Sequence, residues 1–177
     1  MEIKELNTSN HIEISFVKNL YIESFPPNER RCVKKMMEFY DSEMPFSILI
    51  IEKENKFVGF LTHWNLTDFI FVEHFAISPE FRNGGYGRNV MELFIEKTDK
   101  PILLEVELPD NDLAMRRIGF YQRIGFNLWE NIEYSQPEYI KGSGAIPMKL
   151  MSFGKLEVEK NFAEIKRKVY SVVYNIV

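Results

Sequence analysis

The sequence lacks the features that mark several large classes of protein. Its 177 residues include a single cysteine, Cys32, which excludes a disulfide framework and a zinc site built from several cysteines. No apolar run approaches the roughly 20 residues that a membrane-spanning helix needs. Met1–Asn10 is polar and mixed in charge, unlike a signal peptide. We therefore expect a cytoplasmic protein with no membrane partner, in which Cys32 is a small apolar residue.

A surplus of basic charge is also missing. Lys and Arg number 22 against 26 Asp and Glu, so the formal net charge is −4, which argues against nucleic acid as the main partner. A local group of backbone N–H groups and arginines can still bind an anionic ligand. Hydrophobic residues make up 45% of the chain, enough for a packed core and against disorder.

The first half of the chain changes from a helical to a strand pattern. Apolar residues recur at helical spacing in Ile12–Phe25, and a second helix is expected from Asn28 to Tyr40. Phe46–Glu52 and Phe57–Trp64 are short apolar runs on either side of a turn, which predicts a β-hairpin. Phe69–Ile77 has few polar positions, which is typical of a central strand covered on both faces.

Strands and helices alternate in the second half. After a glycine-rich turn, the pattern predicts in order a helix, a strand, a helix and two strands, over Gly87–Thr98, Pro101–Glu107, Asn111–Ile124, Phe126–Tyr134 and Ala145–Phe153. The order of elements predicts an α/β (α+β) fold with a mixed sheet of six or seven strands flanked by helices.

We expect one domain over residues 1–153 and an extension over residues 154–177. Within the extension, Glu157–Ile176 spaces its apolar residues at three or four positions, as an amphipathic helix does. Its apolar stripe would pack on its own domain or on a partner, so a homodimer is one outcome.

The glycine-rich turn Arg82–Gly87 lies between the best strand and a good helix. A helix N-terminus leaves about four backbone N–H groups unpaired and carries partial positive charge, so it can hold phosphate oxygens. An ordinary strand-to-helix turn is the alternative. The turn is not a P-loop, because Gly-Lys-Ser/Thr is missing, and no third glycine completes a dinucleotide-binding pattern.

Three segments together resemble the GNAT superfamily of acyl-CoA-dependent N-acetyltransferases. Ala76–Gly87 resembles its coenzyme-binding motif, as Arg82-x-x-Gly85-x-Gly87 between a strand and a helix. Arg116–Phe126 is similar to the family's helix-to-strand segment, which ends Phe-Tyr-x-x-x-Gly-Phe. Phe25–Arg31 is a weaker match to the region between the first two helices of some members. The resemblance spans roughly residues 10–153.

The resemblance implies acetyl-CoA as cosubstrate and no metal. In the family, the strand before the turn binds the pantetheine arm through its backbone, the turn holds the pyrophosphate, and the acyl group lies between the Phe69–Ile77 and Pro101–Glu107 strands. The residues that this assigns to the coenzyme are Phe75, Ala76, Ile77, Arg82, Asn83, Gly84, Gly85, Tyr86, Gly87, Arg88 and Asn111. Asn111 precedes Tyr121 by ten residues, where about seven is usual, so this carry-over is the least direct.

Two residues are candidates for catalysis. Tyr121 matches the family's tyrosine near the thioester sulfur, and a tyrosine is protonated at neutral pH and suits a general acid. Glu73 is an acid in an otherwise apolar strand face, where burial should raise its pKa and make it a better base. The structural alternatives are a tyrosine in a helix core and a carboxylate that is hydrogen-bonded to neighbouring loops.

Three further aromatic residues are open to interpretation. Alternation puts His74 on the opposite face of the strand from Glu73, so we interpret it as structural. His63 and Trp64 end a hairpin strand and would line the acceptor pocket or form an exposed edge.

The function predicted is direct transfer of acetyl from acetyl-CoA to a primary amine of a small molecule or peptide. Another acyl donor or acceptor class is a second enzymatic possibility. The alternative outside enzymes is a module of the same fold that binds acyl-CoA as a sensor and does not turn it over.

Overall fold

The elements follow the predicted order along the chain. A computed structural model describes residues 1–176. The strands are β1 (Glu2–Glu5), β2 (Phe46–Lys53), β3 (Lys56–Asn65), β4 (Ile70–Ile77), β5 (Ile102–Glu107), β6 (Asn127–Leu128), β7 (Tyr134–Gln136) and β8 (Ile146–Phe153). The helices are α1 (His11–Ser24), α2 (Val33–Tyr40), α3 (Tyr86–Glu96), α4 (Asp112–Ile124) and α5 (Val158–Lys168), with short helices η1 (Pro27–Glu29), η2 (Pro79–Phe81) and η3 (Val169–Val173).

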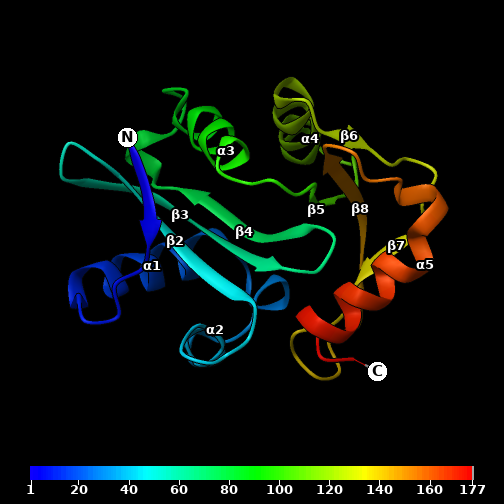
Figure 1. The fold of residues 1–177 in the computed structure, drawn as a ribbon, viewed down its shortest axis with the longest axis horizontal. Coiled ribbons are helices and arrows are strands. Elements are labelled where there is room, and N and C mark those ends of the chain that lie inside the picture. The colour runs from blue at the N-terminus through cyan, green and yellow to red at the C-terminus, as the bar shows by residue number, and fades with distance from the viewer. Residues whose placement is uncertain (177) are drawn as a thin grey trace. The chain divides into compact units, whose positions relative to one another are not determined.

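The predicted α/β class is confirmed, and the sheet is larger than predicted. Eight strands form a mostly antiparallel sheet flanked by helices (Figure 1), against the six or seven expected. Within residues 1–176, no helix is long and apolar enough to cross a membrane. The chain divides into two compact units: the first is Met1–Asn65 with Val72–Asp99, and the second is Leu66–Phe71 with the chain from Lys100 onward.

The first unit is built on the predicted hairpin. Strands β2 and β3 pair antiparallel from Phe46↔Trp64 to Lys53↔Lys56. Helix α1 packs on them through rings such as Tyr21 against Phe60, whose centroids lie 6.1 Å apart. Consecutive residues of β3 then face opposite sides: Trp64 meets α2, while His63 meets α3. Helices α1 and α2 therefore cover one face of this unit's strands and α3 the other.

Two local features of the first unit differ from what the sequence predicted. Helix α2 begins at Val33, not Asn28, because Pro26 and Arg30 are extended on either side of the short helix η1. The other is β1, which pairs with β2 from Glu2↔Glu52 to Glu5↔Leu49 and was not predicted from its mixed, polar sequence.

The second unit is organised around β8. This strand pairs antiparallel with β5 from Ile102↔Phe153 to Glu107↔Met148, and β6 and β7 also pair with it. The single strand predicted over Phe126–Tyr134 is therefore two short strands, joined by the segment that contains Trp129 and Ile132. Helix α4 packs against β5 and β6.

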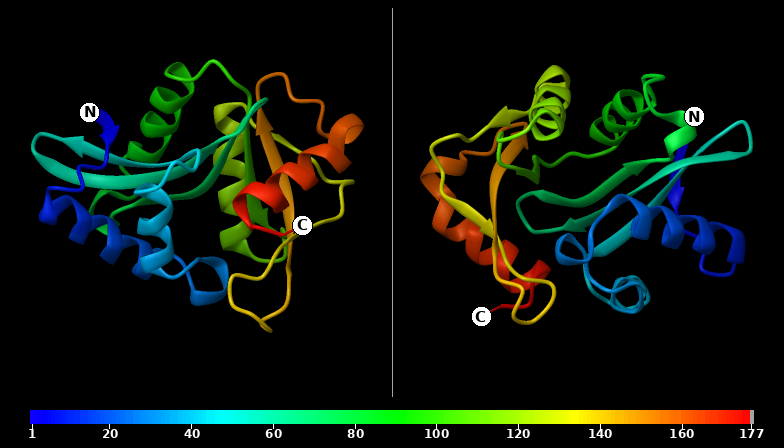
Figure 2. Two further views of the ribbon diagram at one scale, coloured as in Figure 1. Left: turned by 60° about the horizontal axis from the view of Figure 1, so that its bottom comes forward. Right: turned by 180° about the vertical axis from the view of Figure 1, so that it is seen from behind.

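The C-terminal extension packs on the second unit (Figure 2). Helix α5 continues as a π-helix, η3, and the buried residues of the two are Val158, Ile165, Val169 and Val173. The hydroxyl of Tyr170 donates to the carbonyl of Ser135 at 2.5 Å. Lys168 forms an ion pair with Asp68, in the segment before β4. Of the apolar stripe predicted for this extension, Val158, Ile165 and Val169 are buried, whereas Ile176 is exposed.

Candidate functional site

The turn before α3 has the geometry of an anion site. Gly85 is the N-cap residue, with φ of 76°, a left-handed conformation that glycine adopts without strain. No side chain caps the helix, so the amides of its first turn face solvent or a ligand. Residues 82–85 and Arg88 are exposed. The arrangement fits phosphate oxygens, which unpaired amides and the helix dipole both favour.

The two arginines at the turn donate hydrogen bonds to different acceptors. Arg82 donates from Nε to the carbonyl of Ile77 at 2.9 Å, which ties the turn to the end of β4. Arg88 donates from Nε to Glu92 Oε1 at 2.7 Å, one helical turn later. Each of these bonds uses only Nε, and both side chains are exposed, so their terminal nitrogens can reach an anion.

A third basic residue lies beside the turn and was missed in the sequence. Lys53, at the end of β2, donates from Nζ to the hydroxyl of Tyr86 at 3.3 Å and lies 5.0 Å from the centre of that ring. The ring of Phe81 packs against Tyr86 from the turn, 5.5 Å away. No local pattern marks a lysine in a hairpin as a ligand, since only the fold brings it to α3.

The end of β4 precedes this turn. Phe75, Ala76 and Ile77 are its last residues, and the next amide, that of Ser78, donates to the Val58 carbonyl on β3 at 2.8 Å. This fixes the strand at the point from which the turn departs. Pantetheine binding by Phe75–Ile77 stays a prediction.

Glu73 is the centre of a buried polar cluster. Its side chain is 2% exposed. Oε1 accepts from Nε of Arg31 at 2.9 Å and also from Nη2, and Oε2 accepts from the indole N–H of Trp64 at 2.8 Å. A guanidinium in this position stabilises the ionised carboxylate. The geometry favours the structural alternative for Glu73, since both oxygens already hold protein donors.

Arg31 is itself enclosed. Its guanidinium carbon lies 5.0 Å from the ring centre of Phe39 and 5.5 Å from that of Trp64. The carbonyl of Arg31 accepts from the hydroxyl of Tyr21 at 3.3 Å. One buried side chain therefore joins β4 to the segment between α1 and α2. Sequence reasoning missed this link, because Arg31 and Glu73 are 42 residues apart.

The histidine beside Glu73 is structural in its contacts. His74 is buried against Tyr21 and Phe25, and its Nε2 lies 3.1 Å from the carbonyl of Glu29. Burial lowers its pKa. Nδ1 of His74 lies 4.0 Å from Oε2 of Glu73, so the tips of these two neighbouring side chains approach each other.

His63 and Trp64 belong to packed regions. Trp64 is 0% exposed and lies between the rings of Phe39 and Phe46, at 5.4 and 4.8 Å. His63 packs on Phe94 of α3 at 5.3 Å, and burial lowers its pKa to about 4. Neither forms the exposed edge that we considered, and Trp64 presents no free surface to an acceptor.

In the second unit, the position of Tyr121 is fixed by contacts within the segment that resembles the Phe-Tyr-x-x-x-Gly-Phe motif. Helix α4 ends at Gly125, which is left-handed, and the amide of Phe126 returns to the carbonyl of Tyr121 at 3.1 Å. The Phe126 ring packs on Tyr121 at 5.3 Å. Tyr121 is 7% exposed, and burial raises its pKa to about 12. The group is therefore protonated throughout the physiological range.

An ion pair lies one helical turn before Tyr121. Arg117 donates to the carboxylate of Glu107 at the end of β5. The charge of Arg117 favours ionised Tyr121 and that of Glu107 opposes it, both less than burial does. Arg117 therefore supplies one of the two charges that act on the tyrosine.

Asn111 has a structural use. Its Oδ1 accepts from the amide of Ala114 at 3.0 Å, which caps α4, and its Nδ2 donates to Asp110 at 2.7 Å. Its predicted contact with the coenzyme arm stays a prediction.

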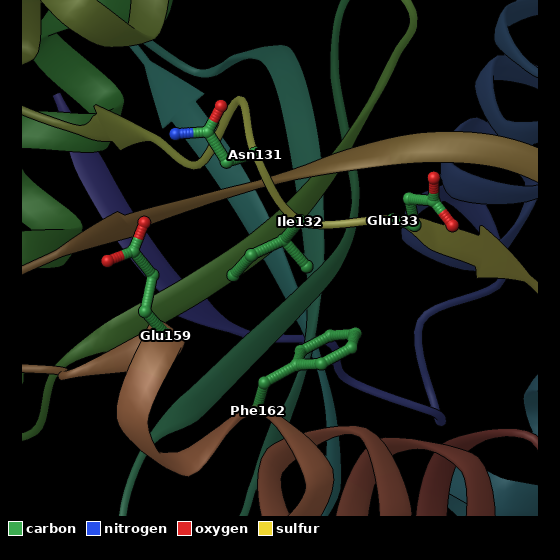
Figure 3. Close-up of a pocket in the computed structure, with 5 residues that line it drawn as sticks. All are labelled: Asn131, Ile132, Glu133, Glu159 and Phe162. Atoms are coloured by element: carbon green, nitrogen blue, oxygen red, sulfur yellow. The ribbon is translucent and has the colours of Figure 1, made fainter.

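An open pocket of about 560 Å³ lies elsewhere in the second unit. Figure 3 shows Ile132 and Phe162 facing each other in it, with Asn131, Glu133 and Glu159 around them. None of the predicted site residues lines it. Among residues 1–176, no group of three or more His, Cys, Asp or Glu side chains is placed to hold a metal ion.

Comparison with known proteins places these features in one family. A family model described as the acetyltransferase (GNAT) family matches residues 14–126. A solved structure from Bacteroides thetaiotaomicron, assigned to the same family, is 41% identical with a TM-score of 0.95, and the match covers 100% of both chains. The curated Bacillus subtilis protein YjbC, assigned as an acetyltransferase, is 30% identical over 109 residues, 60% of this chain and 56% of YjbC.

A more distant structure shares the fold alone. A Bacillus subtilis acetyltransferase solved in complex with CoA is 14% identical, with a TM-score of 0.59, and the match covers 88% of this chain and 99% of that one.

Proposed function

The chain belongs to the GNAT family of acetyltransferases and is an acyltransferase, and we propose that it moves acetyl from acetyl-CoA directly to a primary amine of a small molecule or peptide. The observation that carries the proposal is Tyr121, a buried and protonated tyrosine fixed by the Gly125–Phe126 turn. A GNAT-fold sensor would not need a proton donor kept in this state.

The donor is bound by the turn before α3. We assign the pyrophosphate to the amides of Asn83–Arg88, with the exposed side chains of Arg82 and Arg88 and the half-buried Lys53 as charge partners. The helix N-terminus supports this assignment, since no side chain caps it and its dipole favours an anion. The pantetheine arm is assigned to the backbone of Phe75–Ile77.

A charged acceptor amine loses two protons in the reaction, and the departing thiolate takes up one. An acceptor amine with a pKa near ~10.4 costs roughly 4–5 kcal/mol to deprotonate at pH 7. Once neutral, its nitrogen bonds to the thioester carbonyl carbon and the carbon–sulfur bond breaks. Tyr121 donates its phenolic proton to the departing thiolate, and water passes the second proton of the amine nitrogen back to the phenolate.

Glu73 has a different role in this proposal. We assign it to holding Arg31, and with it the α1–α2 segment, because its two oxygens accept from Arg31 and Trp64. Arg31 and Trp64 stabilise the ionised carboxylate of Glu73, which makes it a weaker base. The amine's proton therefore goes to water or to a group on the acceptor side.

Release of free thiol from acetyl-CoA across a panel of amines tests the proposal. We expect release with at least one amine class, lowered about 10²–10⁴-fold in Tyr121→Phe while the affinity for CoA is unchanged. Tight CoA binding without thiol release from any amine would instead identify a sensor.

A further inference from the structure

Four tyrosines gather around one carboxylate of the second unit, outside the residues assigned above. Glu105 is half-buried on β5. The hydroxyl of Tyr134 donates to its Oε1, and that of Tyr174 donates to its Oε2 at 2.7 Å. Burial and the Glu105 charge both raise the pKa of Tyr134, so this hydroxyl keeps its proton. The carboxylate is thereby fixed in one orientation on the strand.

The rings form a continuous array. Centroid distances are 6.0 Å from Tyr134 to Tyr170, 6.3 Å from Tyr170 to Tyr174, and 5.3 Å from Tyr174 to Tyr139. We call these four tyrosines with Glu105 the Glu105 cluster. Its members come from β5, from β7 and the loop after it, and from the C-terminal extension.

The extension contributes two of these rings through an unusual piece of backbone. Residues Val169–Val173 form a π-helix, and the amide of Tyr174 donates to the carbonyl of Val169 at 3.3 Å. Such single-turn π-helices occur frequently at functional sites. Here the π-helix directs Tyr170 toward Ser135 and Tyr174 toward Glu105.

A carboxylate lined by aromatic rings is suited to a cation. The face of an aromatic ring attracts an ammonium group, and aromatic cages are used to bind quaternary ammonium ligands. One ring of the cluster already holds such a group: Nζ of Lys166 lies 5.1 Å from the centre of Tyr170. Tyr139, Tyr170 and Tyr174 are only half-buried, so their rings are in reach of a ligand.

The cluster lies near the proposed general acid. Glu105 precedes Glu107 by two residues on β5, and alternate residues of a strand share a face roughly 7 Å apart. Glu107 pairs with Arg117, one helical turn before Tyr121, and its charge acts on that tyrosine. A group bound at Glu105 is therefore within the length of a small molecule of the reacting centre.

We propose that the Glu105 cluster binds a cationic group of the acceptor other than the amine that is acetylated. The substrate class is then a primary amine that also carries an ammonium group a few bonds away. The cation stays charged in the cluster while the other nitrogen loses its proton and attacks. This inference rests on the proposed function and assigns the C-terminal extension to acceptor recognition.

Two amines of the same shape separate charge from size. The cationic probe is (3-aminopropyl)trimethylammonium, and its uncharged counterpart at that end is 4,4-dimethylpentylamine. Calorimetric binding to the full chain in the presence of CoA should favour the cationic probe by about 10-fold or more, because only its trimethylammonium end attracts the rings and the carboxylate. Equal affinities for the two probes would overturn the proposal.

Variants locate the binding. Glu105→Gln removes the charge, and Tyr174→Leu removes a ring, so each should reduce the preference to within about 3-fold, whereas Tyr174→Phe keeps the ring and should retain most of it. Tyr40 donates to Glu5 in the first unit, so Tyr40→Leu is a matched control that should leave the preference intact. An unchanged preference in a folded Glu105→Gln protein would place the cation elsewhere.

Turnover is measured separately with the same amines. The binding preference tests the Glu105 cluster even if no amine is acetylated. A complete lack of acetylation would contradict only the proposed reaction. Acetylation of both probes with equal kcat/KM and equal affinity would contradict only the cluster.

Discussion

The two units recognise their proposed ligands by different means. In the first, the turn before α3 offers backbone amides at an uncapped helix end, on an exposed surface with basic side chains beside it. In the second, Tyr121 and the Glu105 cluster are side chains, held by burial and by hydrogen bonds from distant segments. A backbone site depends on conformation, whereas a side-chain site depends on the chemistry of each residue.

The largest effect is expected at the side-chain site, from loss of one hydroxyl. Tyr121→Phe removes the proposed proton donor and leaves the ring that packs on Phe126, so kcat should fall about 10²–10⁴-fold. Steady-state kinetics with acetyl-CoA and the best amine measure it. Phe120, the neighbouring residue, supplies a control in Phe120→Leu, which should keep most of kcat. A kcat unchanged in Tyr121→Phe would remove the tyrosine from the mechanism.

The buried ion pair in the first unit should have the next largest effect, on stability. Glu73→Gln leaves the Arg31 charge without its partner, and breaking a buried pair in this way typically costs 3–5 kcal/mol. Chemical denaturation followed by fluorescence measures the free energy of unfolding. Glu38→Gln is the control, because the Lys34–Glu38 pair is exposed and should be worth about 0.5 kcal/mol or less.

The same variant distinguishes a positioning role from a base. If Glu73 only positions Arg31, the pH–rate profile of Glu73→Gln should keep its shape, and its KM for the amine should rise. A stable variant that lost the acidic limb of the profile would identify Glu73 as the base and weaken the contrast between the two units.

A change of backbone conformation tests the donor site. Gly85→Val places a β-branched residue at φ of 76°, where nothing lies within 4 Å of the added Cβ, so the effect is conformational strain rather than a clash. We expect CoA to bind about 10–100-fold more weakly by calorimetry. Gly142→Val, with φ of 87° in the loop before β8, introduces similar strain and should leave CoA affinity unchanged. Normal affinity in Gly85→Val would move the pyrophosphate elsewhere.

The same contrast explains what could be predicted from the sequence. The turn before α3 and the end of α4 are each formed by consecutive residues, and glycines mark both. Their patterns could therefore be recognised in the sequence. Glu105 meets Tyr134 and Tyr174 over 29 and 69 residues, and only strand pairing and the docked extension bring them together. Strand β1 was missed for a related reason: its polar residues form a strand because β2 offers an edge.

Stability should also depend on pH through the histidines of the first unit. All three histidines of the chain lie in that unit, and burial lowers the pKa of His63 to about 4 and also lowers that of His74. Both are neutral in the folded state, whereas in the unfolded chain they protonate near pH 6.5. Stability is therefore full above pH 6.5 and falls as the pH drops toward 4, by up to about 1.4 kcal/mol per pH unit for each histidine.

Tryptophan fluorescence can assign this loss of stability to one unit, because Trp64 lies in the first unit and Trp129 in the second. In a Trp129→Phe background, the midpoint of urea unfolding reported by Trp64 should fall between pH 7 and pH 5. His74→Gln should reduce that slope, since an amide in place of the imidazole takes up no proton over this range. A slope that His74→Gln and His63→Gln together leave unchanged would assign the acid sensitivity to carboxylates, which both units contain, and the distinction between the units would not extend to stability.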